Sequence, residues 1–360
     1  ASTTTGIDGT VAIGKDALTA LTTGGNNIAI GYQAGLDITT GTANTIFGAN
    51  AGSDFDTESG NTFIGTNAGS GAVTCNEVVC VGATTFTAAA SANGTVAIGN
   101  YALRYLTSGA GNVAVGYQTM DAITDGARNV GLGYGALSAS TSAIDVVAIG
   151  KDAIADGNVT SAAVGSIGIG SSALKALTSG AGNTAVGYES LKTAATESQT
   201  VALGYQSMAI ALPGSNGVFI GYKAGYDLSQ GGDNNVAIGH ESMSGTHGGG
   251  SEKNTAVGSG TMAGAINAAA RNTAVGYDAG AAITTATDNV LLGSNSGDSI
   301  TTANKCTFIG NSAGTAVTVT NSATSDGTVG IGYQALTSLT TGEKNTAIGY
   351  EALKTQIDGD

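Results

Sequence analysis

The sequence has no tryptophan, one proline and only 12 lysine and arginine residues, against 26 aspartate and glutamate residues. Proteins that bind DNA or RNA need clustered basic side chains to neutralise phosphates. Here the basic residues are spread thinly and the net charge is −14, so we expect no nucleic-acid partner. The charge also disfavours an anionic membrane surface. No apolar run reaches the roughly 18 residues of a membrane-spanning helix, so we expect no membrane insertion.

Side chains that commonly carry catalysis or hold metals are scarce. The two histidines, His240 and His247, do not match a known metal-ligand spacing. The three cysteines, Cys75, Cys80 and Cys306, do not match one either, and the sequence leaves open whether they are free. We expect no metal site, no cofactor and no enzymatic activity.

Glycine, by contrast, is abundant, with 59 residues, and it recurs with a fixed period. A glycine that follows an apolar residue returns in twenty units, with steps of 17 to 22 residues. A short period over a whole chain is typical of solenoid proteins, in which each unit stacks on the next. The repeat glycines are Gly14, Gly31, Gly48, Gly65, Gly82, Gly99, Gly116, Gly133, Gly150, Gly170, Gly187, Gly204, Gly221, Gly239, Gly258, Gly276, Gly293, Gly310, Gly332 and Gly349.

Each unit has the same order of residues before its glycine. The preceding residue is always apolar, the residue two before is usually small, and the residue three before is mostly Thr or Val, which is typical of a short strand. We expect the glycines to adopt corner dihedral angles that a Cβ forbids. Asparagine, four before the glycine, is expected to hydrogen-bond the backbone at a corner. These asparagines are Asn27, Asn44, Asn61, Asn112, Asn129, Asn183, Asn235, Asn254, Asn272, Asn289 and Asn345.

The period predicts an all-β fold, a parallel β-solenoid of about 20 laps with a 17-residue period that forms one domain over residues 1–360. Laps about 4.8 Å apart would give a rod of roughly 95 Å. We expect the aliphatic residues before the glycines to form the core, and the small residues two before the glycines to face away from it. A stripe of small residues suits close packing against a second rod. We therefore expect an oligomer, in particular a trimer.

Some repeats resemble those of known fibre proteins. Asn183-Thr-Ala-Val-Gly-Tyr188 and Asn345-Thr-Ala-Ile-Gly-Tyr350 resemble the Ser-Val-Ala-Ile-Gly-like repeats of trimeric autotransporter adhesin heads. They are also similar to the Asn-Thr-Ala-Ile-Gly-Tyr repeats of phage tail fibres. The resemblance spans nearly the whole chain, and it implies a left-handed parallel β-roll that assembles as a trimer and presents an adhesive surface. The chain differs from the adhesin heads in its longer period and its extra column of tyrosines.

These tyrosines follow the glycine in nine units, several of them on consecutive laps. Rings stacked about 4.8 Å apart could contact a host-surface glycan or protein. They could equally stabilise the stack or line a surface between chains. The candidates for surface contact are Tyr117, Tyr134, Tyr188, Tyr205, Tyr222, Tyr333 and Tyr350. A sparse basic column five before the glycine is expected to balance acidic neighbours on the surface.

These observations favour a structural fibre or adhesin: an extracellular, cell-surface or virion rod that associates with itself and presents surfaces for attachment to a host. The repeats at both ends have no polar cap, so we expect either a segment of a longer fibre or ends that stack head to tail. The second case would be a self-polymerising filament subunit, which is the alternative function. A third class is ice binding by rows of threonines. The pairs here, such as Thr39-Thr40, are adjacent and would point to opposite sides of a strand.

Overall fold

The structure is a computed structural model that describes residues 6–71, 74–88, 91–211, 216–228, 232–316, 326–340 and 342–357. Its contacts divide the chain into two units, Ala1–Gly182 and Asn183–Asp360. Both consist of short parallel strands that recur once per lap, where a lap runs from one repeat glycine to the next. The one helical element in the described ranges is a 3-10 turn, η1 (Ser161–Ala163). The predicted parallel β-solenoid is confirmed, whereas the single domain stays a prediction.

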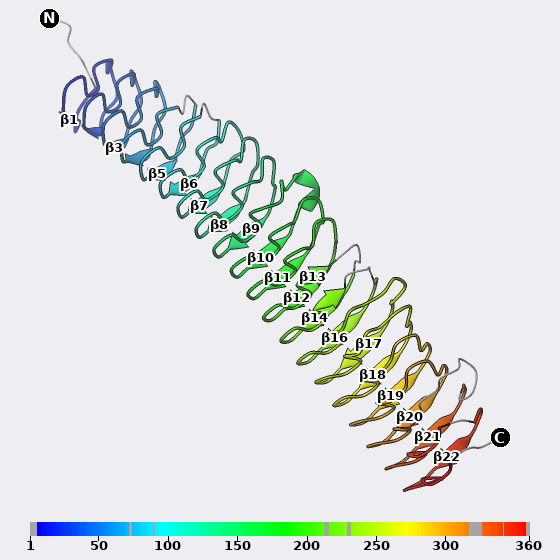
Figure 1. The fold of residues 1–360 in the computed structure, drawn as a ribbon. Coiled ribbons are helices and arrows are strands. Elements are labelled where there is room, and N and C mark those ends of the chain that lie inside the picture. Colours follow the sequence, from blue (N-terminus) through cyan, green and yellow to red (C-terminus); the bar gives the residue numbers. More distant parts are fainter. Residues whose placement is uncertain are drawn as a thin grey trace, which may run out of the picture. The chain divides into compact units, whose positions relative to one another are not determined.

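The first unit contains ten three-residue strands that stack in chain order (Figure 1). Neighbouring strands pair in parallel and in register, so that equivalent residues of consecutive laps lie side by side. The strands are β1 (Val11–Ile13), β2 (Ile28–Ile30), β3 (Thr45–Phe47), β4 (Thr62–Ile64), β5 (Val79–Val81), β6 (Val96–Ile98), β7 (Val113–Val115), β8 (Val130–Leu132), β9 (Val147–Ile149) and β10 (Ile167–Ile169).

The second unit repeats this arrangement with ten further three-residue strands. They are β11 (Thr184–Val186), β12 (Val201–Leu203), β14 (Val218–Ile220), β16 (Val236–Ile238), β17 (Thr255–Val257), β18 (Thr273–Val275), β19 (Val290–Leu292), β20 (Thr307–Ile309), β21 (Val329–Ile331) and β22 (Thr346–Ile348). A small second sheet pairs β13 (Ile210–Ala211) with β15 (Asp227–Leu228).

Each strand ends at its repeat glycine because the chain turns there with a positive φ and almost no room. Gly116, after β7, has φ +139°, a conformation that side chains rarely adopt. A Cβ at Gly116 would lie 2.6 Å from the carbonyl oxygen of Gly133 on the next lap. The corner therefore needs glycine both for its dihedral angle and for the close approach of the next lap.

The direction of the strand side chains differs from our expectation. From β2 to β22 the middle residue of every three-residue strand is buried, as at Ala114, whereas the residues on either side of it, Val113 and Val115, are partly exposed. Successive side chains of a strand point to opposite faces, so only one of the two sets can be internal. The expected aliphatic core and outward small stripe are both wrong: the small column is inside, and the aliphatic column faces solvent.

The interior is filled by residues from the middle of the strand and from the turn that follows it. Around β6 and the turn after it, these are Ala97, Ala102, Leu103 and Leu106, all fully buried. Leu103 takes a left-handed conformation, with φ +48°, which directs its side chain inward from the turn. Each lap thus encloses only a few side chains, and stacking against neighbouring laps completes their burial.

Candidate functional site

On the side of the sheet that faces away from the interior, each unit carries two columns of uncharged residues, which we call the outward face. It consists of the first and third residues of every three-residue strand. The first is Val, Ile or Thr, and the third is Ile, Val, Leu or Phe, so that no charged residue occurs in either column. Ile13, Phe47 and Ile348 are more than half exposed. The outward face is therefore an uncharged, largely aliphatic surface on a protein of net charge −14.

The outward face is as large as the largest apolar patch of a typical single-chain protein. Ten strands about 4.8 Å apart, with two outward residues about 7 Å apart, give a strip about 45 Å long in each unit. That strip has a projected area of about 300 Å², which is already the size of the largest apolar patches on typical monomers. A contiguous apolar surface of this kind is typical of a contact with another molecule.

Each tyrosine of the tyrosine column directly follows its repeat glycine and is therefore two residues beyond the end of the strand. The rings of this column stack from one lap to the next. Ring centroids are 5.1 Å apart for Tyr188 and Tyr205 and 5.5 Å apart for Tyr205 and Tyr222, and the rings are within 14° of parallel. His240 continues this stack at 5.0 Å from Tyr222. The pairs Tyr117–Tyr134 and Tyr333–Tyr350 stack in the same way, at 5.5 and 5.2 Å. The structure thus brings the predicted tyrosines together in three separate ladders.

Stacking restricts what the tyrosines can bind. Sugars commonly pack on the face of an aromatic ring, but in these ladders the ring faces lie against one another. The exposed fractions of Tyr188, Tyr205 and Tyr222 are nevertheless between 41% and 46%. The exposed parts are therefore ring edges and hydroxyl groups, which can donate and accept hydrogen bonds.

Charged side chains border the ladder of the second unit. The Glu189 carboxylate accepts hydrogen bonds from Lys192 Nζ and from Gln206 Nε2, both at 2.8 Å. The negative charge of Glu189 raises the pKa of the neighbouring Tyr188 phenol. Hydrogen bonds, chiefly from Lys192, lower the pKa of Glu189, which keeps it ionised. Lys223 Nζ lies 5.4 Å from the ring centre of Tyr222.

The predicted corner glycines share one conformation. The φ angles lie between +131° and +145° at Gly14, Gly31, Gly48, Gly65, Gly187, Gly204 and Gly349. At the first six, a Cβ would come into conflict with the backbone of the glycine one lap later. These glycines are positioned to build the turn, and they are not arranged to hold a ligand.

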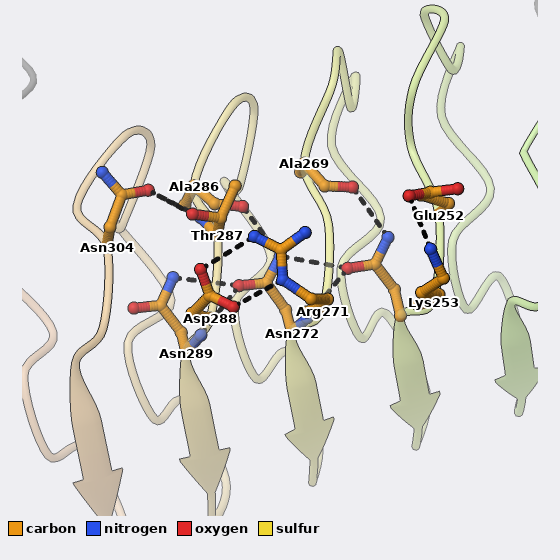
Figure 2. Close-up of polar contacts among 11 residues, drawn as sticks. Glu252, Lys253, Ala269, Arg271, Asn272, Ala286, Thr287, Asp288, Asn289 and Asn304 are labelled. Atoms are coloured by element: carbon orange, nitrogen blue, oxygen red, sulfur yellow. Dashed lines mark hydrogen bonds and ion pairs between the residues drawn. The ribbon is translucent and has the colours of Figure 1, made fainter.

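The predicted corner asparagines form a buried hydrogen-bonded ladder (Figure 2). Asn272 Nδ2 donates at 2.8 Å to the carbonyl of Ala286, which lies at the corner of the next lap. Asn272 Oδ1 accepts from the backbone N–H and the Nδ2 of Asn289, at 3.1 and 3.0 Å, which ties it to the next lap. Each such asparagine therefore fixes both the corner and the stacking register.

The other predicted asparagines follow this pattern where their partners are described. Asn27 and Asn44 donate to the carbonyls 14 residues later, Gly41 and Glu58, at 2.8 and 2.9 Å. Asn61 does the same to Cys75 at 3.1 Å, and Asn183 to Glu197 at 2.6 Å. Asn345 is only half-buried, and the carbonyl 14 residues after it lies outside the described residues.

Surface charges pair along the laps. Arg271 makes a two-pronged contact with Asp288 one lap later, with Nε···Oδ1 at 2.6 Å and Nη2···Oδ2 at 2.9 Å (Figure 2). Arg128 and Asp145 repeat the same distances in the first unit, and the hydrogen bond from Arg128 lowers the pKa of Asp145. Both aspartates stand in the basic column itself, which sequence reasoning did not foresee. Exposed pairs of this kind add little stability.

The threonines of the turns direct their hydroxyls along the stack. Thr22 Oγ1 donates to the carbonyl of Thr39 at 3.0 Å, Thr107 to Thr124 at 2.8 Å and Thr284 to Thr301 at 2.9 Å. These hydroxyl protons are used between laps and are not offered as a flat array to water. The geometry gives ice binding no specific support.

His247 and the cysteines are internal. His247 is fully buried, and burial lowers its pKa to about 4, although the negative charge of Asp227 acts to raise it. The three cysteines are buried and form no disulfide, and burial raises the pKa of Cys306 to about 11. Among the described residues, no group of three or more His, Cys, Asp or Glu side chains is placed to hold a metal ion. In the same ranges no helix is both long and apolar enough to cross a membrane.

No protein-family model matches the chain, and no curated protein matches it. The candidate site therefore rests on the geometry of this chain.

Sequence reasoning missed the outward face, although the sequence contains a signal for it. Wherever the middle strand residue is Phe, as at Phe63, Phe219 and Phe308, the residue six positions later is Gly. Wherever the later residue is Leu or Met, as at Leu103 and Met120, the middle residue is small. Such compensation in size is expected only for residues that share an interior. It would have placed the middle column inside.

Proposed function

We propose that this chain is a structural fibre module of an extracellular or virion surface, which associates with copies of itself and presents its remaining surface for attachment to a host. The outward face carries this proposal. The resemblance of the repeats to adhesin heads and tail fibres supports the same function and favours three chains.

A second copy of the chain is the partner that best suits the outward face. Both copies present ridges with the same spacing between laps, so a contact made at one lap can be repeated at each of the following laps. The face is uncharged, so two chains of net charge −14 can approach through it without bringing charges of the same sign into contact. Burying aliphatic side chains is favourable by about 25 cal/mol per Å² of apolar surface. Three such faces around one axis would cover every outward column.

Attachment would use the turns and the ring edges of the tyrosine ladders, which stay outside the apolar columns. The lap between Gly150 and Gly170 is three residues longer than the basic repeat and carries η1. Insertions at one point of a lap become loops on one face, where binding surfaces often lie. Copies of such a loop on one particle would gain affinity by avidity, without any catalytic chemistry.

Electron microscopy together with native mass spectrometry tests the proposal. The expected result is discrete particles of one length whose mass is that of three chains. Indefinite filaments would favour the alternative of a self-polymerising subunit. A mass of one chain at micromolar concentration would contradict self-association.

A receptor role of the tyrosines can be tested separately. A glycan array probed with the wild type and with the Tyr188→Ala, Tyr205→Ala, Tyr222→Ala triple variant should show a loss of binding if the ladder contacts a sugar. Equal binding by both proteins would assign the ladder to stability alone.

A further inference from the structure

We propose that the ladder of Tyr188, Tyr205 and Tyr222 is a modification site, at which one-electron oxidation joins consecutive laps through dityrosine bonds. The inference rests on contacts within one chain. It is therefore independent of the proposed fibre function and of the number of chains in a particle.

The ladder holds the phenol rings in a geometry suited to coupling. The rings are 5.1 and 5.5 Å apart and within 14° of parallel. Because the three residues occupy equivalent positions of consecutive laps, their hydroxyl-bearing edges lie on the same side of the stack. All three are more than 40% exposed, so an oxidant can reach them and the side chains can rotate into bonding contact.

The neighbourhood of Tyr188 provides an acceptor for the proton. A phenol that loses an electron becomes a strong acid, and oxidation is easier where a base lies close to it. Glu189 directly follows Tyr188, its negative charge acts on the Tyr188 phenol, and it is kept ionised by Lys192 and Gln206. Tyr188 is therefore the ring of this ladder at which a radical should form most readily.

The reaction needs an external oxidant, which we assign to the class of haem peroxidases acting with hydrogen peroxide. Tyr188 and Tyr205 each give up one electron and the phenol proton, and Glu189 takes the proton of Tyr188. The two radicals join through the ring carbons next to the oxygens. The hydrogens on those carbons then move to the oxygens, which restores both phenols. The two electrons and two protons lost overall reduce one hydrogen peroxide to two waters.

The chain contains its own controls. Tyr32 and Tyr277 are at least as exposed as Tyr188, Tyr205 and Tyr222, but the equivalent residues of the laps before and after each of them are not aromatic. They can couple only with tyrosines of other molecules. Rings held together on one chain have an effective concentration in the millimolar range, so at micromolar protein we expect about 1,000-fold more coupling within the ladders.

The experiment treats the full chain with a haem peroxidase and hydrogen peroxide and maps dityrosine peptides by mass spectrometry, with mixed 14N- and 15N-labelled chains to separate links within and between molecules. We expect links within one chain at Tyr188–Tyr205, Tyr205–Tyr222, Tyr117–Tyr134 and Tyr333–Tyr350. Tyr205→Phe should abolish the first two and leave Tyr117–Tyr134 unchanged, which also reports that the variant is folded. Glu189→Gln should lower the Tyr188–Tyr205 yield several-fold relative to Tyr117–Tyr134.

Three results would overturn the proposal. They are the absence of any dityrosine, links spread evenly over all exposed tyrosines, or the same pattern of links in denaturant as in the folded chain. None of these results bears on whether the chain assembles into a fibre, which the mass measurement decides separately.

Discussion

The ring of Phe63 occupies the space that a side chain at Gly69 would need. A Cβ at Gly69 would lie 2.5 Å from Phe63 Cδ1, which is closer than real contacts allow, and Phe63 is fully buried. Gly69 has φ +64°, but Leu103 and Met120 adopt similar angles at the equivalent positions of other laps. The backbone conformation alone therefore does not demand glycine at this position. Glycine is there because the phenylalanine already fills the lap.

The first prediction concerns this pair. Gly69→Ala should lower the free energy of unfolding by about 2 to 3 kcal/mol, because the new methyl group forces the packed ring to move. Gly94→Ala is the matched control: its φ is +63°, yet a Cβ there would meet nothing within 4 Å. The free energy of unfolding of the control should therefore fall by only about 1 kcal/mol, which is the strain of an alanine at the left-handed angle. Chemical denaturation measures both.

Exchanging both residues should restore the fit. Phe63→Ala alone should cost about 3 to 5 kcal/mol. Adding Gly69→Leu to Phe63→Ala recreates the combination of Ala97 and Leu103 and should recover part of that loss. If Gly69→Leu is as harmful with Phe63→Ala as without it, the two residues do not share one space.

The second prediction concerns the asparagine ladder. Asn272→Asp keeps the shape but removes both donors of Nδ2, and it places a carboxylate against the carbonyl of Ala286 and the Oδ1 of Asn254. We expect a loss of about 3 kcal/mol at pH 7, because one oxygen of the buried carboxylate faces two acceptors, while only the other keeps its donors from Asn289. Protonation of the new carboxyl should restore a donor, so the loss should shrink in acid.

Asn158→Asp is the control for this substitution. Asn158 is exposed, and its Oδ1 accepts from Thr141, a role that a carboxylate can keep. It should change the unfolding midpoint very little. Equal effects of Asn272→Asp and Asn158→Asp would show that the buried ladder does not hold the corners.

The third prediction is a pH dependence of stability that arises from His247. Its pKa is lowered from 6.5 to about 4 in the folded chain, because burial disfavours the charged imidazole. Above pH 6.5 the imidazole is neutral in both the folded and the unfolded chain, so His247 does not change the free energy of unfolding. Between pH 6.5 and 4 the unfolded chain binds the proton more readily, so stability falls as the pH is lowered, by up to about 3 kcal/mol.

This contribution can be separated from that of the carboxylates by comparing variants over the same pH range. The difference in stability between pH 7 and pH 4 should shrink in His247→Gln. It should be unchanged in His240→Gln, whose imidazole is 58% exposed in the tyrosine stack. Parallel pH profiles of the wild type and His247→Gln would contradict the prediction.

The repeat made much of the fold predictable, and the reasons are local. The interval between Gly116 and Gly133 fixes the length of a lap, and a glycine after a β-branched tract marks where the strand must turn. The direction of the strand was not predictable from hydrophobicity, because Val113 and Val115 are more apolar than Ala114 yet lie outside. Which set is internal depends on the way the chain turns at Gly116 and on how little room a lap encloses.

Other parts of the candidate site depend on residues one lap apart. The pairing of Arg271 with Asp288 and the stacking of His240 on Tyr222 become evident only when laps are aligned side by side. Reading each column along the stack, with charge and ring type included, would have found both. The burial of His247 had no such signal, because its lap is two residues longer than the basic repeat.

Self-association through the outward face is tested most directly by the mass of a charged variant. Val115→Lys with Ile149→Lys places two lysines on this face, on β7 and β9, whereas Ala110→Lys with Ala162→Lys adds the same charge at exposed turn positions. Sedimentation equilibrium should show trimers for the wild type and for the turn variant. The face variant should associate at least about 100-fold more weakly, because unpaired lysines would be buried. A wild type that stays a single chain, or a face variant with the wild-type mass, would contradict the assignment of this surface.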